Sequence, residues 1–235
     1  MALLNIRSAA KVKFTSTGKM RVVSSSYGYG GGGGGGGGGG LSSGLQAFYR
    51  LSDTSDSSGN GNTLTNNGGV TFSSGKIGNA ANLQGNQTLT AQIASITSGS
   101  PGSYSCWINR NGIEEVPLCV VKAFGTSVYA DSHIGGRLAF YLPSTGNEPS
   151  QSLASNVWVH VVLSHDSTIG VKLYVNGQLF HTENTANAFQ DSAFTLGAGD
   201  GQNGKGLVDA VGIWNRALTL GEVSSLYNSG AGIEL

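Results

Sequence analysis

The residues that could carry out catalysis are few and poorly spaced for it. Glycoside hydrolysis needs two carboxylates on either side of the scissile bond, and the only adjacent acidic pair is Glu114–Glu115. Neighbouring residues on a strand point to opposite faces, and this pair falls in a predicted hairpin loop, so the two carboxylates cannot act together. The four histidines show no metal-ligand spacing, and no serine lies in a nucleophile elbow. The sequence therefore predicts that the protein is not an enzyme.

Three predicted loops are rich in side chains with which proteins bind sugars. Sugar sites combine an exposed aromatic ring with amide and hydroxyl groups that match the sugar hydroxyls. The loops span residues 129–136, 141–151 and 197–206. Their candidate ligand-binding residues are Tyr129, His133, Tyr141, Asn147, Asp200, Gln202 and Asn203. The alternative is that these are ordinary solvated loops.

The elements that must position these loops form one large all-β unit, residues 41–235. Short apolar runs alternate there with Asn, Gly and Ser breaks, a pattern typical of a sandwich or jelly roll. The predicted strands lie at residues 45–51, 80–83, 104–108, 118–122, 137–142, 158–164, 171–175, 194–196 and 207–214. Asn176–Gly177 predicts a type I′ hairpin turn. Thr219 and Glu222 predict a capping box that begins one short C-terminal helix, which Gly230 would end.

The N-terminal part differs in both charge and pattern. Residues 1–40 carry five basic and no acidic residues, whereas the remainder carries eight basic and 13 acidic residues. Alternating runs at residues 12–15 and 20–23 predict a β-hairpin within a basic docking arm, residues 1–29. A two-stranded hairpin is marginal in water, so it needs a partner. Dense Lys/Arg clusters are absent, which makes nucleic acid an unlikely partner; the alternative is that the charges only keep an appendage soluble.

Residues 30–40 are an unbroken run of eleven glycines. Such a run is typical of a flexible spacer. The alternative is a polyglycine helix, which has no internal hydrogen bonds and would pack against parallel copies in a homotrimer.

Two cysteines, Cys106 and Cys119, are too few for a disulfide framework. A hairpin turn near residues 111–112 would place them opposite each other. A cross-strand disulfide and two free, partly buried thiols both remain open.

Several segments, taken in order, resemble the laminin-G-like branch of the concanavalin-A-like superfamily. Residues 44–51 and the D-S-S-G-N-G-N run at 56–62 are similar to its first strand and loop, and residues 75–85 to its second strand. Residues 158–179 resemble its W-H-H-V and L-Y-V-D-G hairpin, and residues 208–218 its closing D-E-V-R-I-Y-N-R-A-L signature. The resemblance covers residues 44–230 and implies a jelly-roll β-sandwich.

Three tryptophans fall in the alternating apolar runs, and we expect paired sheets to enclose all three. They are Trp107, Trp158 and Trp214. We expect Asn215–Arg216 to fasten the helix to a sheet rather than to contact a ligand.

Members of this superfamily often bind Ca²⁺ through the early acidic loop and a late Asp. The resemblance places candidate ligands at Asp56 and Asp209, with Asn60 and Asn62 as further oxygen donors. Ala210 stands where the family usually has a second acidic or polar residue, which lowers the number of charged ligands. The alternative is that Asp56 ties its own loop by hydrogen bonds to the backbone.

These features together predict a structural or decoration protein of a bacteriophage virion that presents a lectin-like domain to surface glycans. Residues 1–29 would dock on other virion proteins, and residues 30–40 would hold the sandwich outward. No signal peptide or membrane-spanning stretch is recognisable, so we expect synthesis in the host cytoplasm and display on the virion surface. The alternatives are a purely architectural capsid or tail cement protein and a bacterial surface adhesin.

Overall fold

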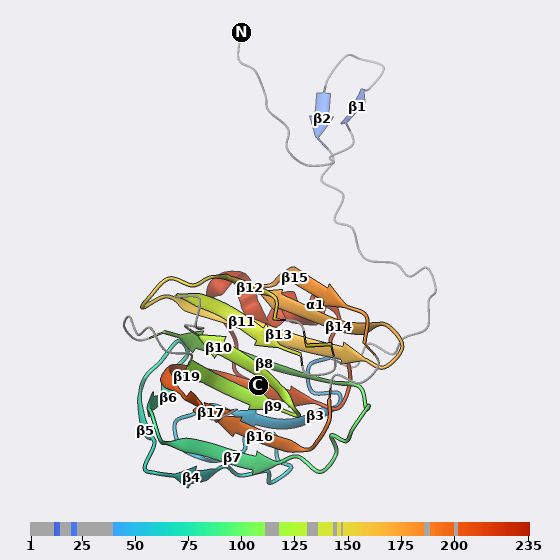
Figure 1. Ribbon diagram of the computed structural model, residues 1–235. Coiled ribbons are helices and arrows are strands. Elements are labelled where there is room, and N and C mark those ends of the chain that lie inside the picture. The colour runs from blue at the N-terminus through green and yellow to red at the C-terminus, as the bar shows by residue number, and fades with distance from the viewer. Residues whose placement is uncertain are drawn as a thin grey trace. The chain divides into compact units, whose positions relative to one another are not determined.

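Figure 1 shows the computed structural model of the chain. The residues it describes are 12–14, 20–22, 40–110, 118–130, 136–142, 145–146, 148–185, 189–199 and 202–235. The chain separates into two units, Met1–Gly38 and Gly39–Leu235. In the first unit, β1 (Val12–Phe14) pairs antiparallel with β2 (Met20–Val22). The predicted N-terminal hairpin is confirmed.

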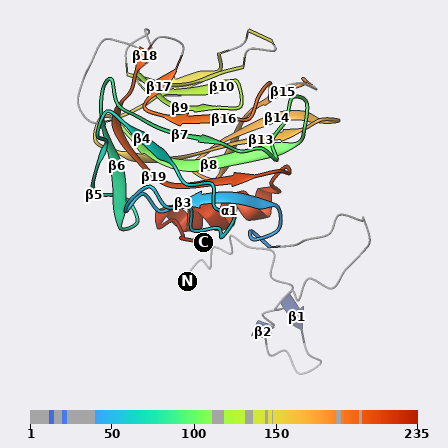
Figure 2. The same cartoon turned by 90° about the horizontal axis from the view of Figure 1, so that it is seen from below.

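The second unit is a β-sandwich whose described strands form two large antiparallel sheets (Figure 2). The first sheet has the strand order β12 (Ser150–Ser152), β11 (Arg137–Tyr141), β10 (Thr126–Ala130), β9 (Leu118–Ala123), β16 (Ala193–Leu196), β7 (Thr88–Gln92) and β4 (Thr65–Asn67). The second has the order β15 (Gln178–Glu183), β14 (Gly170–Val175), β13 (Trp158–Asp166), β8 (Gly102–Asn109), β19 (Lys205–Trp214), β6 (Asn79–Gln84) and β5 (Thr71–Ser74), and β3 (Leu45–Tyr49) also pairs with β19. A small ribbon joins β17 (Ala198–Gly199) to β18 (Gln202–Asn203). The predicted all-β sandwich is confirmed.

Every strand predicted from the sequence is present, but several others were missed. The sequences of β4 and β12, Thr-Asn-Asn and Ser-Gln-Ser, contain no apolar residue. Both lie at an edge of their sheet. Backbone pairing forms these strands, and alternation of apolar side chains cannot reveal them.

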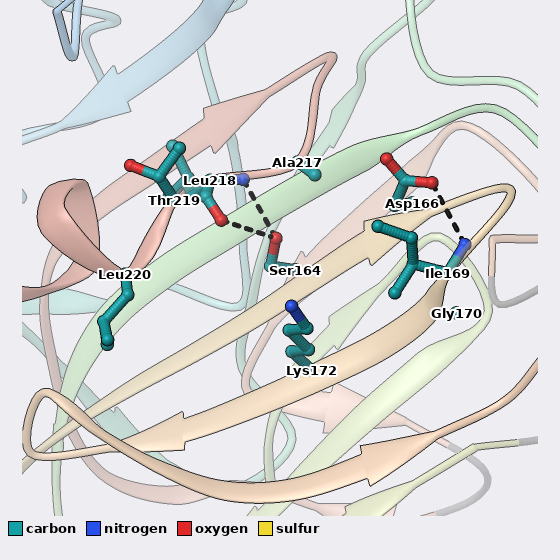
Figure 3. Close-up of a pocket in the computed structure, with 9 residues that line it drawn as sticks. All are labelled: Ser164, Asp166, Ile169, Gly170, Lys172, Ala217, Leu218, Thr219 and Leu220. Carbon is teal, nitrogen blue, oxygen red and sulfur yellow. Dashed lines mark hydrogen bonds between the residues drawn. The ribbon is translucent and has the colours of Figure 1, made fainter. Parts of the chain in front are cut away.

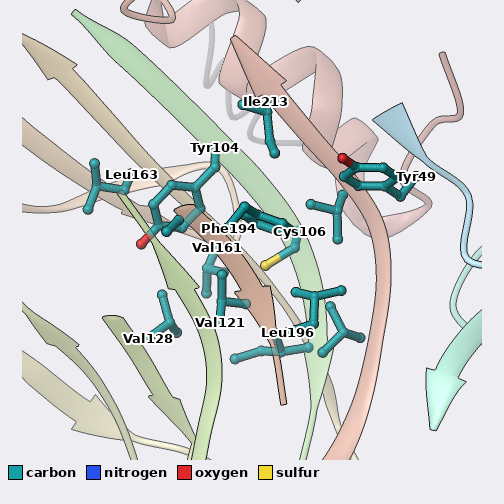
Figure 4. Close-up of a cluster of buried hydrophobic side chains, with 14 of the residues drawn as sticks. Tyr49, Tyr104, Cys106, Val121, Val128, Val161, Leu163, Phe194, Leu196 and Ile213 are labelled. Atoms are coloured by element: carbon teal, nitrogen blue, oxygen red, sulfur yellow. The ribbon is translucent and has the colours of Figure 1, made fainter. Parts of the chain in front are cut away.

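The interior between the sheets is built from alternate residues of the central strands (Figure 4). Tyr104 and Cys106 of β8 and Leu163 of β13 point into it, where they pack with Phe194 of β16. Successive side chains on a strand point to opposite faces, so the residues between these face the other side of the sheet. Burial raises the pKa of the Cys106 thiol far above its usual range.

The predicted hairpin between the two cysteine-bearing strands is wrong. β8 pairs with β13 and β19, whereas β9 lies in the opposite sheet beside β10 and β16. The connection between β8 and β9 therefore crosses from one sheet to the other. Cys106 is a free, buried thiol, and the side chain of Cys119 lies outside the described residues.

The tryptophans are not enclosed between the sheets, which corrects the prediction. Trp107 and Trp214 are buried, at 3% and 0% exposure, and Trp158 is half-buried. Each lies on the outer face of the eight-stranded sheet, because its neighbours on the strand fill the interior. The helix α1 (Leu220–Tyr227) covers this outer face (Figure 2) and turns it into a second core.

The predicted capping box of α1 is confirmed. The Thr219 hydroxyl accepts a hydrogen bond from the Glu222 amide, and the Glu222 carboxylate accepts one from the Thr219 amide. Arg216 fastens the helix as expected, because its guanidinium pairs with Glu222 at 2.6 Å. The helix ends differently from the prediction: Asn228, with φ of 47°, forms the left-handed cap, and the 3₁₀ turn η1 (Asn228–Gly230) follows.

The Asn176–Gly177 turn joins β14 to β15 as predicted, with φ of 49° and 75° at the two residues. Gly177 also lies against the helix, since a Cβ added there would meet Tyr227 Cδ1 at 2.9 Å. None of the helices in the described part of the chain is long and apolar enough to cross a membrane.

Candidate functional site

A cavity of about 440 Å³ opens beside the start of α1 (Figure 3). Its floor contains Ser164 of β13 and Lys172 of β14, which are cross-strand partners on the outer face of the eight-stranded sheet. Segment 217–220 forms one wall, and the β13–β14 turn closes one end with Asp166 and Ile169. The volume falls within the roughly 300–1,000 Å³ typical of small-ligand sites.

Buried serines hold the wall of the cavity in place. The Leu218 amide donates to Ser164 Oγ at 2.9 Å and to Ser103 Oγ at 3.1 Å. The Ser103 hydroxyl in turn donates to the Arg216 carbonyl at 2.8 Å. Through these hydrogen bonds the two serines attach segment 216–218 to the sheet, so the wall of the cavity is pre-organised.

The remaining lining offers one cation, one carboxylate and two exposed aliphatic side chains. Lys172 Nζ makes no hydrogen bond or ion pair with any described residue. Asp166 Oδ1 accepts three hydrogen bonds, two from Thr168 and one from the Ile169 amide. The Thr168 side chain contributes most to lowering the pKa of Asp166, so this carboxyl stays ionised near neutral pH. Ile169 and Leu220 are 56% and 57% exposed at the rim.

The early acidic loop is tied to β3 by its own hydrogen bonds. Asp56 accepts from the backbone amides of Phe48, Ser58 and Asn62 at 2.9 to 3.0 Å. Burial opposes its ionisation, but these hydrogen bonds outweigh burial and lower its pKa. The Asn60 and Asn62 amide groups donate to backbone carbonyls of β3. The structure thus brings together three of the four predicted calcium ligands, in a loop satisfied by hydrogen bonds.

Asp209, the fourth predicted ligand, binds a different turn. Its Oδ2 accepts from the backbone amides of Lys76 and Ile77, both at 2.7 Å. The side chain is 0% exposed, and Oδ1 has no hydrogen-bond partner among the described residues. Burial raises the pKa of Asp209 to about 6, and the nearby Glu234 charge adds to this effect.

The donor set fits a shared calcium site poorly. The described residues contain no group of three or more His, Cys, Asp and Glu side chains that could hold a metal ion. Asp209 Oδ1 is a buried acceptor without a partner, but the Asp56 loop makes its hydrogen bonds with other residues. Calcium binding stays a prediction from the family resemblance.

Of the predicted sugar-binding residues, only Tyr141 has its side chain in the described part of the chain. His133, Asn147 and Asp200 lie outside the described residues, as do the side chains of Tyr129, Gln202 and Asn203. Tyr141 is half-buried at the end of β11 and packs against Ala139. None of these residues lines the cavity beside α1. Sequence reasoning missed that cavity because its two sides lie about fifty residues apart in the chain.

A serine–histidine pair lies beneath the helix. Ser105 Oγ and His160 Nε2 are 2.9 Å apart, and both residues are 2% exposed. Burial lowers the pKa of His160 to about 3, so the ring is neutral near pH 7. Such a hydrogen bond is the geometry of a nucleophile and its base, but the rings of Trp107 and Tyr227 pack at a tilt against the histidine. A substrate cannot reach this pair.

Comparison with known proteins relates this architecture to a family. The model of the concanavalin A-like lectin/glucanases superfamily matches residues 83–224. A search of curated protein sequences finds no match.

Similar solved structures include domain 4 of AbnA, a GH43 extracellular arabinanase from Geobacillus stearothermophilus, solved in complex with arabinotriose. It is 24% identical, with a TM-score of 0.61, and the alignment covers 80% of this chain and 98% of that chain. The binding domain of Paraclostridial Mosquitocidal Protein 1 is 21% identical, with a TM-score of 0.65 and coverage of 81% and 53%. The receptor-binding domain of botulinum neurotoxin D is 14% identical, with a TM-score of 0.60 and coverage of 81% and 54%. This chain thus spans about half the length of those two toxin domains. The family model covers more than half of the sequence, so this chain belongs to the concanavalin A-like lectin/glucanases superfamily.

Proposed function

We propose that this chain is a non-enzymatic virion protein that displays a carbohydrate-binding β-sandwich to host or environmental glycans. The observation that carries the glycan-binding part is the cavity beside α1, with a lysine that no described residue pairs with, an ionised carboxylate and exposed aliphatic side chains. Sugars present hydroxyl groups and apolar ring faces, and such a lining complements both. The similar AbnA domain, which this chain covers almost completely, was solved with arabinotriose.

The virion part of the proposal rests on the N-terminal unit. Its hairpin, β1 and β2, has only two strands, and such a hairpin is marginal unless it joins a larger assembly. The first 40 residues carry five positive charges and no negative one. We propose that residues 1–29 bind other virion proteins and that the eleven glycines act as a spacer, alone or in a homotrimer. The sandwich would then stand on the virion surface, where it reaches glycans.

The direct test of glycan binding is a glycan array probed with the full chain in multivalent display. We expect binding to a restricted group of glycans. Uniformly negative results would refute glycan binding and would favour a purely architectural role.

The virion role is tested on particles purified from the producing cells. Immunogold labelling should find the chain on their surface, and deletion of residues 1–29 should remove it from them. Loss of particle stability in that deletion, with adhesion unchanged, would indicate a cement protein instead. Recovery of the chain in the envelope of the producing cells, with none on particles, would indicate a bacterial adhesin.

A further inference from the structure

We propose that the cavity beside α1 binds a sugar that carries a carboxylate, and that Lys172 pairs with this carboxylate. The inference rests on the proposed glycan binding and adds to it the site and the chemical class of the ligand. A uronic acid and a sialic acid share this chemistry.

Lys172 is the group on the cavity floor that has no hydrogen-bond or ion-pair partner among the described residues. Its neighbour Ser164 is 3% exposed and makes its hydrogen bonds with Ser103 and Leu218. Lys172 is half-buried, and its ammonium group has three donors that no described residue accepts. A ligand carboxylate can accept from these donors and pair with the ammonium charge, which no described residue does.

Asp166 restricts which anion fits. Its Oδ1 is fully engaged with Thr168 and Ile169, whereas its Oδ2 accepts no hydrogen bond in the described structure. Sugar hydroxyls can donate to that oxygen. The same negative charge disfavours ligands of high anionic density, because a second or third anionic group would lie near it. A ligand with one carboxylate among several hydroxyls satisfies both Lys172 and Asp166.

The rim supplies the apolar part of the site. Ile169 and Leu220 stand more than half exposed on opposite sides of the cavity mouth (Figure 3). Their methyl groups can pack on the C–H face of a sugar ring. The serine-bonded segment that carries Leu220 holds one of these contacts in position.

The experiment compares matched glycans on an array probed with the full chain. Sialylated glycans are paired with their desialylated forms, and uronate oligosaccharides with their carboxyl-reduced forms. We expect the chain to bind the carboxylated member of at least one of the two series about ten-fold more tightly, as a charge-assisted hydrogen bond in a partly desolvated site would give. Which series responds distinguishes sialic from uronic acid.

Three variants assign the preference to the cavity. Lys172→Gln should abolish it, and Lys172→Arg, which keeps the cation, should retain most of it. Arg50→Gln is the matched control, because it removes one positive charge from an exposed residue outside the cavity lining; it should leave the preference unchanged. A preference that survives Lys172→Gln would overturn the inference.

Protection of Lys172 from acetylation by a bound glycan can be measured on the wild-type chain, so this test does not depend on whether a variant folds. A carboxylated glycan selected on the array should slow acetylation of Lys172 several-fold, measured by mass spectrometry, and should leave Lys76 unaffected. Equal binding of both members of every pair would refute the inference while glycan binding stood. No binding to any glycan would refute the proposed function and this inference with it.

Discussion

Replacement of Asp209 by Asn should remove one component of the pH dependence of stability. Asp209 is fully buried, and burial raises its pKa from 3.8 to about 6 in the folded protein. The folded protein therefore binds this proton more tightly than the unfolded chain does. The resulting stabilisation is present at acidic pH and is lost as the pH rises through 6. Asn is similar in shape, can still accept from the Lys76 and Ile77 amides, and does not titrate.

The magnitude follows from the two pKa values. Proton linkage predicts that Asp209 contributes roughly 1.4 kcal/mol to the free energy of unfolding at pH 5.0 and that this contribution is lost by pH 7.5. His160 acts in the opposite direction, because burial lowers its pKa from 6.5 to about 3 and the neutral ring must take up a proton on unfolding in acid. The wild-type curve alone therefore shows a small net change. The difference between the wild type and Asp209→Asn cancels the His160 contribution.

The measurement is urea unfolding of both proteins at pH 5.0 and pH 7.5, with linear extrapolation to water. Between these pH values, the wild type should lose about 1.4 kcal/mol relative to Asp209→Asn. A difference between the two proteins that does not change with pH would refute the buried, protonated state of Asp209 at pH 5. Glu234, whose charge contributes to the raised pKa, provides a second check: Glu234→Gln should move the effect to lower pH.

Three further predictions concern local structure. Gly177→Ala should cost about 1–3 kcal/mol in urea unfolding, because alanine would have to adopt a φ of 75°, which a Cβ disfavours, and this Cβ would meet Tyr227 Cδ1 at 2.9 Å; an unchanged midpoint would contradict this contact. Thr219→Ala should cost about 1 kcal/mol by the same assay, since it removes the N-cap, whereas Thr219→Ser should cost much less. Cys106 should resist a thiol reagent in the folded protein and react once urea unfolds it, because the thiol is buried with a raised pKa; rapid reaction of Cys106 in the folded protein, mapped by mass spectrometry, would contradict its burial.

Local features of the sheet and helix around the candidate site could be read from the sequence. The turn at Asn176–Gly177, the capping box at Thr219 and the role of Arg216 each depend on residues close together in the chain. The cavity beside α1 could not be read in this way. It forms only because Ser103 and Ser164, on neighbouring strands, bind the amide of Leu218 and hold a distant segment over the sheet.

The sequence by itself determined part of the strand segments, the N-terminal hairpin, the cap of α1 and the class of fold, because periodicity and turn chemistry act over a few residues. Tertiary structure alone decided which sheet each strand joins. It placed β8 and β9 in opposite sheets, although they follow each other in the chain. It also decided that Trp107 and Trp214 face outward beneath α1. Alternation shows that a strand has two faces, but when a helix buries the outer face as well, both faces are apolar and only the packed structure distinguishes them.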